Sequence, residues 1–117
     1  MTETDTLYFS ARRHHQAGSF DVAKEIYRKI ITINPCHAGA LQMLGILAHK
    51  SGETSAALEL LKRAESEDPK NPALLINLGV VNREMGDTAA AKVFLQKALA
   101  LDPKQSTGHF NLGNLYR

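Results

Sequence analysis

Apolar residues along the chain follow the spacing of paired amphipathic helices. Between residues 38 and 50, Leu41, Leu44 and Ala48 lie three or four positions apart, which places them on one face of a helix. The turn sequence SGE at 51–53 interrupts the pattern, and EDPKN at 67–71 ends the next segment because proline cannot continue a helix. The second stripe, between these two breaks, consists of Ala57, Leu58, Leu60, Leu61 and Ala64.

The same pattern recurs with a fixed period of 34 residues. Self-similarity at such a period is typical of repeat architectures, in which helix pairs stack on one another. The sequence therefore predicts three helix–turn–helix units and the first helix of a fourth. The columns that carry the period are Leu44, Leu78 and Leu112; Gly45, Gly79 and Gly113; Gly18, Gly52 and Gly86; Ala23, Ala57 and Ala91; and Pro35, Pro69 and Pro103.

Two kinds of glycine are expected in each unit. Gly52 stands where a helix ends, and glycine adopts the left-handed conformation of a helix C-terminus without steric cost. Gly45 stands inside a helix, where glycine costs about 1 kcal/mol relative to alanine. We expect Gly45 with Ala57, and Gly79 with Ala91, to allow close approach of the two helices in a pair.

Composition excludes several classes of protein. The 117 residues, 44% of them hydrophobic and 22% charged, suit a single well-packed domain. The net charge of +2 is spread along the chain and does not favour nucleic acid as a partner. No apolar run is long enough to span a membrane, and the polar start is not a signal peptide. We expect a cytoplasmic protein, and the single cysteine, Cys36, excludes an internal disulfide.

No catalytic, cofactor or metal site is predicted. Cys36 and His37 are adjacent, but two ligands do not make a zinc site, which usually needs four. The acidic cluster ESED at 65–68 is interpreted as a solvated helix end. His14 and His109 fall on packing stripes, so we expect them in the core or half-buried. We therefore predict that the chain is not an enzyme.

The order of these residues resembles the tetratricopeptide repeat family over nearly the whole chain. The resemblance divides the chain into units 4–37, 38–71 and 72–105 and a truncated unit 106–117. The first unit is the most divergent, because Ser10 and Ala11 stand where the other units have leucine and glycine. The resemblance implies an all-α, right-handed solenoid whose first helices line a concave surface.

That concave surface is the predicted binding site. The resemblance implies a protein or peptide ligand, without nucleic acid or membrane. Gln42, Ile76 and Arg117 should line the same surface. The residues expected to bind a peptide are Tyr8, Phe9, Arg12, His15, Met43, Ile46, His49, Lys50, Asn77, Val80, Arg83, Phe110, Asn111 and Asn114.

Two patterns on this surface suggest the chemistry of the ligand. A basic ladder, His15, His49, Arg83 and Arg117, keeps the 34-residue period and favours an acidic ligand. Ordinary solubilising charge at helix ends explains the ladder equally simply. Asparagines in the two NLG sequences, Asn77 and Asn111, could hold a peptide backbone, because an amide both donates and accepts. They resemble the asparagine ladder in the repeat arm of O-linked N-acetylglucosamine transferases.

Three functions follow as hypotheses. The first is a non-enzymatic scaffold that binds a peptide on the concave face, and the second is a substrate-selecting arm of a larger enzyme such as a glycosyltransferase. The third is self-assembly through the solenoid ends, as a homo-oligomer that pairs through the C-terminal helix in residues 106–117. Residues 106–117 are expected to cover Val93, Phe94 and Leu101 while leaving apolar surface bare around Leu112, Gly113 and Tyr116.

Overall fold

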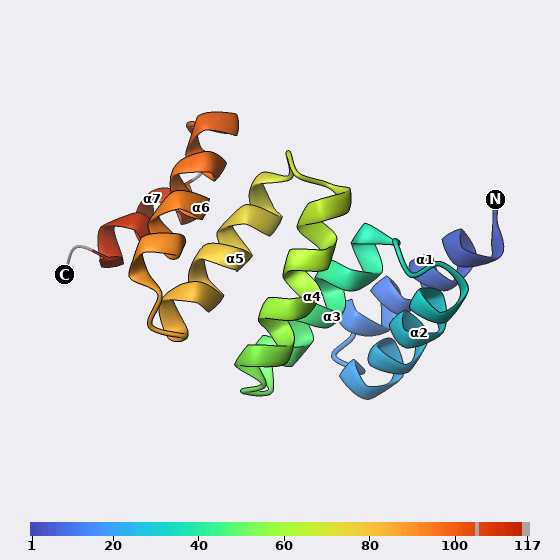
Figure 1. Ribbon diagram of the computed structural model, residues 1–117. Coiled ribbons are helices and arrows are strands. Elements are labelled where there is room, and N and C mark those ends of the chain that lie inside the picture. Colours follow the sequence, from blue (N-terminus) through green and yellow to red (C-terminus); the bar gives the residue numbers. More distant parts are fainter. Residues whose placement is uncertain (105, 116–117) are drawn as a thin grey trace.

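The computed structural model describes residues 1–104 and 106–115, and for 106, 107, 114 and 115 it describes the backbone alone. These residues form helices joined by short turns, with no strand among them. The helices stand in a row, so that the molecule measures 43 × 27 × 24 Å (Figure 1). They are α1 (Glu3–Gln16), α2 (Phe20–Ile33), α3 (Ala38–Lys50), α4 (Thr54–Glu67), α5 (Pro72–Glu84), α6 (Thr88–Leu101) and α7 (Ser106–Leu115).

Packing between consecutive helices confirms the predicted all-α solenoid. Within pairs, α1 packs on α2, α3 on α4 and α5 on α6. Between pairs, α2 packs on α3, α4 on α5 and α6 on α7. The first helices also meet along one side, because α3 touches α5 and α5 touches α7.

The turn inside each pair ends its first helix as the sequence predicts. Gly18, Gly52 and Gly86 have φ values of +83°, +80° and +86°, in the left-handed region. At the second turn, the Gly52 N–H donates to the His49 carbonyl at 3.0 Å and the Glu53 N–H donates to the Ala48 carbonyl at 2.9 Å. This pair of bonds is the Schellman arrangement, which satisfies carbonyls that the helix leaves free.

The glycines inside α3 and α5 are close-approach positions, as predicted. A Cβ atom on Gly45 would lie 2.7 Å from Cγ of Leu61 and 3.4 Å from the Ala57 carbonyl oxygen. On Gly79 it would lie 2.6 Å from Cγ of Leu95. The nearest atoms belong to a leucine of the partner helix, and the carbonyl oxygen of the predicted alanine comes next at 3.4 Å in both pairs.

In the first unit, different residue types make the corresponding contact between the two helices. Ala11 occupies the glycine position, and Tyr27 occupies the position of Leu61 and Leu95. Both are fully buried in one cluster with Ala23, Ile30 and other apolar residues.

Helix α7 covers the third unit, but of the three residues expected beneath it only Phe94 is half-buried against the cluster that α7 meets. Leu112 is half-buried against this cluster, which contains Leu75, Ile76, Leu95 and Ala98, so part of its surface remains exposed and part packs on the third unit. Val93 and Leu101 remain 50% and 45% exposed, because the cover falls on the face of α6 that carries Leu95 and Ala98.

Two further expectations concern α7: bare surface around Gly113 and a packed His109. Gly113 is exposed, and a Cβ atom there would meet nothing within 4 Å. His109 is exposed rather than packed, and its Nε2 donates to the Pro103 carbonyl at 2.9 Å. Tyr116 lies outside the described residues.

Candidate functional site

A pocket between α3 and α5 brings five of the predicted binding residues together. Its volume is about 220 Å³, and Leu61 and Val81 complete its lining. We call it the α3–α5 pocket. The predicted residues in it are Ile46, His49, Lys50, Asn77 and Val80.

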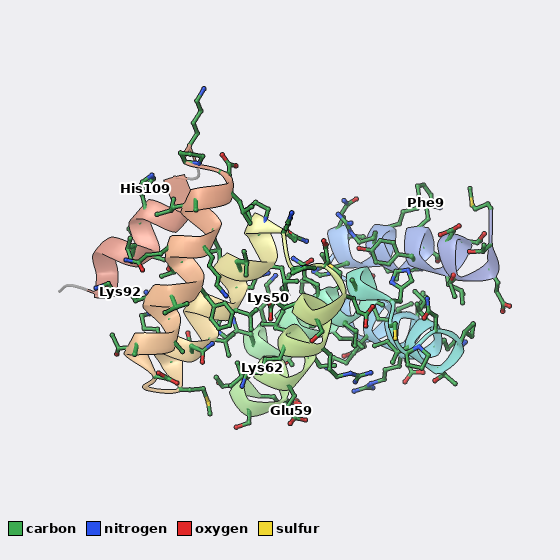
Figure 2. The ribbon with its side chains drawn as sticks, turned by 45° about the horizontal axis from the view of Figure 1, so that its top comes forward. Phe9, Lys50, Glu59, Lys62, Lys92 and His109 are labelled. Atoms are coloured by element: carbon green, nitrogen blue, oxygen red, sulfur yellow. The ribbon has the colours of Figure 1, made fainter. Side chains whose placement is uncertain are left out.

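A second, wider hollow of about 630 Å³ lies along α1. Tyr8, Phe9 and Arg12, all predicted binding residues, line it together with Met1, Asp5, Arg13 and Gln16. Figure 2 shows the Phe9 side chain projecting away from the body of the molecule, and it is 66% exposed.

Tyr8 also has a packing role between the first two units. A Cβ atom on Gly39 would lie 2.7 Å from the Tyr8 hydroxyl oxygen, so this ring lies directly on the start of α3. The Tyr8 ring lies 4.9 Å from the His37 ring, measured between centroids. Arg12 Nη1 donates to the Tyr8 hydroxyl at 3.4 Å. Tyr8 thus forms a contact between the first two units, and Arg12 contacts Tyr8 within α1.

Each member of the basic ladder that the structure describes has a partner within the chain. His15 Nδ1 lies 3.2 Å from the Tyr27 hydroxyl, and Arg83 Nη1 donates to Asn111 Oδ1 at 3.4 Å. His49 Nε2 lies 2.7 Å from Glu84 Oε2. Arg117 lies outside the described residues. Glu84 therefore offsets part of the positive charge that the ladder was expected to present.

His15 does not meet the condition for titration near neutrality, because it is half-buried. Burial, followed by the charges of Lys50 and Arg12, lowers the pKa of His15 below its ordinary value of 6.5. The His15 ring also packs edge-on against Phe20 and Tyr27, with centroids 5.6 and 6.1 Å away.

This lowered pKa predicts how stability should depend on pH. The unfolded state takes up a proton at His15 at higher pH than the folded state does, so protonation favours unfolding. As pH falls from 7.5 through 6.5, His15 should progressively lower the free energy of unfolding, and above that range it should have no effect. Urea unfolding at several pH values, compared with His15→Gln, should show a smaller acid loss in the variant. Identical pH profiles would contradict this assignment.

The remaining predicted residues lie in mixed environments. Phe110 is 66% exposed, whereas Asn111 is buried and Met43 is half-buried against the cluster that contains Ala11 and Tyr27. The side chain of Asn114 is outside the described residues.

Two residues expected on the binding surface belong to the interior. Gln42 is buried, and its Oε1 accepts at 3.2 Å from Nδ2 of Asn71, the residue that caps the N-terminus of α5. Ile76 is buried in the cluster that α7 covers. Each residue is covered at the following first helix: Gln42 by Asn71 at the N-terminus of α5, and Ile76 by the cluster that Leu112 of α7 joins.

Sequence reasoning missed Leu61, Val81 and Glu84. Leu61 was assigned to packing alone, and it serves both the core and the pocket. The signal for Glu84 is its place one residue after Arg83 in the ladder, near the end of α5, where it meets His49 of the preceding first helix.

Other kinds of site find no support in the part of the chain that the structure describes. No group of three or more histidine, cysteine, aspartate or glutamate side chains is placed to hold a metal ion there. None of the described helices is both long and apolar enough to cross a membrane.

Paired helices that stack in register, with glycine turns and close-approach glycines at a fixed period, define the chain as a helical repeat protein. A sequence model of the tetratricopeptide repeat matches residues 14–76 and 48–109. The chain belongs to the tetratricopeptide repeat family. A comparison with curated protein sequences found no match.

Several solved structures have the same fold. A crystal structure of MamA is 23% identical, with a TM-score of 0.89 over 97% of this chain and 67% of that chain. An O-GlcNAc transferase mutant from Thermobaculum terrenum is 25% identical, with a TM-score of 0.88 over 98% of this chain and 23% of that chain. The first repeat domain of Spaghetti, bound to an HSP90 peptide, is 14% identical, with a TM-score of 0.90 over 97% of this chain and 90% of that chain.

Proposed function

We propose that the chain is a non-enzymatic scaffold that binds an extended peptide segment of another protein in the α3–α5 pocket. The observation that carries this proposal is the convergence of five predicted residues on one pocket. Repeats of this family typically mediate protein–protein interaction. The Spaghetti domain, which has the same fold, holds a peptide.

The chemistry of the pocket suits a peptide. Ile46, Val80 and Val81 offer an apolar wall for a side chain, and the Asn77 amide can both donate to and accept from a peptide backbone. Lys50 is exposed at the pocket and adds a positive charge, while His49 is paired with Glu84. We therefore expect an apolar anchor residue with an acidic neighbour in the ligand.

Asn77 is a sharper probe of backbone binding than Asn111. Asn111 is buried and accepts from Arg83, so its replacement changes a contact inside the protein as well. Asn77 is half-buried and lines the pocket directly.

The test begins with peptides selected from a random display library on the purified protein. Asn77→Ala and Val80→Ala should each weaken a selected peptide by about tenfold, since truncating a central anchor costs roughly 1–2 kcal/mol. Gln96→Ala, which removes an exposed amide from α6, should leave the affinity unchanged. Selected peptides that bind both pocket variants as tightly as the original chain would contradict the proposal.

A substrate-selecting arm is the second candidate function. The observation that favours it is the alignment of 98% of this chain with 23% of the Thermobaculum terrenum transferase. Mass spectrometry of the native protein, purified with an antibody to residues 1–104, would decide between the two. A species with an attached transferase domain supports the arm, and a species without any enzyme domain supports the separate scaffold.

A further inference from the structure

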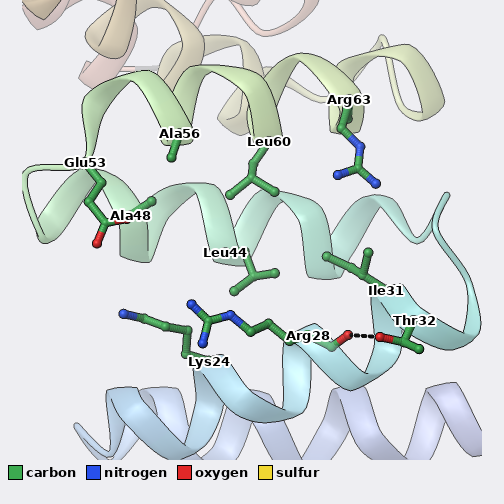
Figure 3. Close-up of a pocket in the computed structure, with 10 residues that line it drawn as sticks. All are labelled: Lys24, Arg28, Ile31, Thr32, Leu44, Ala48, Glu53, Ala56, Leu60 and Arg63. Atoms are coloured by element: carbon green, nitrogen blue, oxygen red, sulfur yellow. Dashed lines mark hydrogen bonds between the residues drawn. The ribbon is translucent and has the colours of Figure 1, made fainter.

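A groove lies between α2 and α4, with α3 as its floor. Its volume is about 400 Å³, within the range of small-ligand pockets. Figure 3 shows Lys24 and Arg28 rising from α2, and Leu60 and Arg63 descending from α4 toward Leu44. We call it the α2–α4 groove. Its full lining is Lys24, Arg28, Ile31, Thr32, Leu44, Ala48, Glu53, Ala56, Leu60 and Arg63.

This groove lies on the other side of α3 from the candidate site. Leu44 and Ala48 face the groove, whereas Ile46 and Lys50 line the α3–α5 pocket. Each pair is offset from the other by two residues, which is about 200° around an α-helix. A ligand in the groove would therefore leave the α3–α5 pocket open.

The groove combines an apolar floor with a basic rim. Leu44 is buried, and Ile31 and Leu60 are half-buried beside it. Three cations, Lys24, Arg28 and Arg63, surround this floor against one carboxylate, Glu53. The excess is therefore two positive charges.

The cations are weakly engaged inside the chain. Arg28 Nη1 lies 4.0 Å from Glu25 Oε1, and both side chains are more than half exposed. Arg63 Nη2 donates to the Pro35 carbonyl at 3.3 Å. Within the described part of the chain, no carboxylate lies within ion-pair distance of Lys24 or Arg63. Surface ion pairs of this length contribute little, so these charges remain available to a ligand.

The corresponding place one repeat later has no excess of positive charge, and a larger apolar side chain stands at one of its floor positions. Adding the 34-residue period replaces Lys24 by Leu58, Ile31 by Glu65 and Leu60 by Phe94. The corresponding positions hold two cations, Lys62 and Lys97, and two carboxylates, Glu65 and Asp87, so their charges balance. The larger Phe94 ring stands at the position that Leu60 occupies in the groove, and Lys97 Nζ lies 5.7 Å from the centroid of that ring. The basic groove is thus particular to the junction of the first two units.

We propose that the α2–α4 groove binds an acidic segment of a partner protein, with a leucine-sized side chain against Leu44 and Leu60 and flanking carboxylates against Lys24, Arg28 and Arg63. Charge complementarity selects this partner, because a net positive rim around an apolar floor favours an anion attached to an apolar group. A nucleic acid is disfavoured, since the groove offers no aromatic ring on which a base could stack.

The chain itself supplies a variant that closes the groove. Leu60→Phe introduces the residue that the next repeat already carries at this position, so the helix pair tolerates the ring. Arg28→Glu reverses one rim charge, and its matched control is Lys62→Glu, the same change at the equivalent position of the next junction. Circular dichroism and thermal unfolding of all three variants establish that they fold.

The experiment is an NMR titration of the isotope-labelled chain with the peptide acetyl-Glu-Glu-Leu-Leu-Glu-Glu-amide. We expect saturable shifts at the amides of Arg28, Ile31 and Leu60. Arg28→Glu should weaken binding by about tenfold or more, Leu60→Phe should abolish it, and Lys62→Glu should change it less than twofold. The same peptide with lysine in place of glutamate should cause no shifts.

Several results would overturn the proposal. They are absence of localised shifts at millimolar peptide, equal shifts in Leu60→Phe, or equal shifts with glutarate alone, which would mark a simple anion site. Shifts confined to Ile46, Asn77 and Val80 would also overturn it, while supporting the α3–α5 pocket instead. If Leu60→Phe does not fold, the comparison of Arg28→Glu with Lys62→Glu decides the outcome.

Discussion

Tyr27→Ala should lower the free energy of unfolding by about 3–5 kcal/mol, the range for removing a buried aromatic ring. Tyr27 has no exposed surface and belongs to the cluster that joins α1, α2 and α3. Its hydroxyl also bonds His15 at 3.2 Å, and its ring lies 6.1 Å from that of Tyr8. Burial raises the pKa of Tyr27 to about 12, so the hydroxyl stays neutral at ordinary pH.

Urea unfolding followed by circular dichroism at pH 8 measures this effect with His15 neutral. Phe110→Ala is the matched control, because it removes a ring that is 66% exposed and should change stability by less than about 0.5 kcal/mol. Equal losses in the two variants would contradict the assignment of Tyr27 to the core of the first unit. If the unfolding free energy of Tyr27→Ala falls less steeply with urea concentration than that of the original chain, the first unit unfolds separately, as repeat arrays allow.

Gly79→Ala should lower the free energy of unfolding by about 1–3 kcal/mol, although alanine is the better helix former by about 1 kcal/mol. The added Cβ would lie 2.6 Å from Cγ of Leu95, which is not the free end of a flexible side chain. Leu95 is fully buried, so its side chain cannot move away without disturbing the packing of α6. The clash therefore outweighs the gain in helix propensity.

Gly113→Ala is the control for Gly79→Ala. It makes the same change at the same column one repeat later, where a Cβ would meet nothing within 4 Å. We expect its stability to be unchanged or raised by up to about 1 kcal/mol. A double variant with Leu95→Ala should recover part of the loss from Gly79→Ala, because the two residues touch. Equal changes in the free energy of unfolding for Gly79→Ala and Gly113→Ala, measured with urea, would contradict the clash and leave helix propensity as the only effect.

The period of the sequence predicted the architecture because it reports backbone requirements. A positive φ at Gly52 and Gly86, and close approach at Gly45 and Gly79, demand glycine directly. The positive φ recurs in the turn of all three units, and the close approach recurs in α3 and α5, so the sequence states each requirement more than once.

Contacts between side chains of different units were less predictable. The pairing of His49 with Glu84, and of Tyr8 with Gly39, depends on how far each unit rotates relative to the next. Residue spacing within a helix fixes which face a side chain takes, but it does not fix that rotation. For the same reason Gln42 and Ile76 were assigned to the binding surface although they are buried.

The α2–α4 groove was missed for a different reason. Searching for columns that repeat emphasises what the units share, whereas the groove arises where they differ. Leu60 in place of Phe94, and Lys24 in place of Leu58, set the first junction apart.

The most direct test of peptide binding in the α3–α5 pocket is paramagnetic broadening by a spin-labelled selected peptide. The peptide carries the label at one end, and the chain is isotope-labelled for NMR. Binding as proposed should broaden the amide signals of Ile46, Lys50, Asn77 and Val80 most strongly, while those of Arg28 and Arg63 on the other side of α3 stay sharp. Strongest broadening at Arg28 and Arg63, or broadening spread evenly over α1 to α7, would contradict the account.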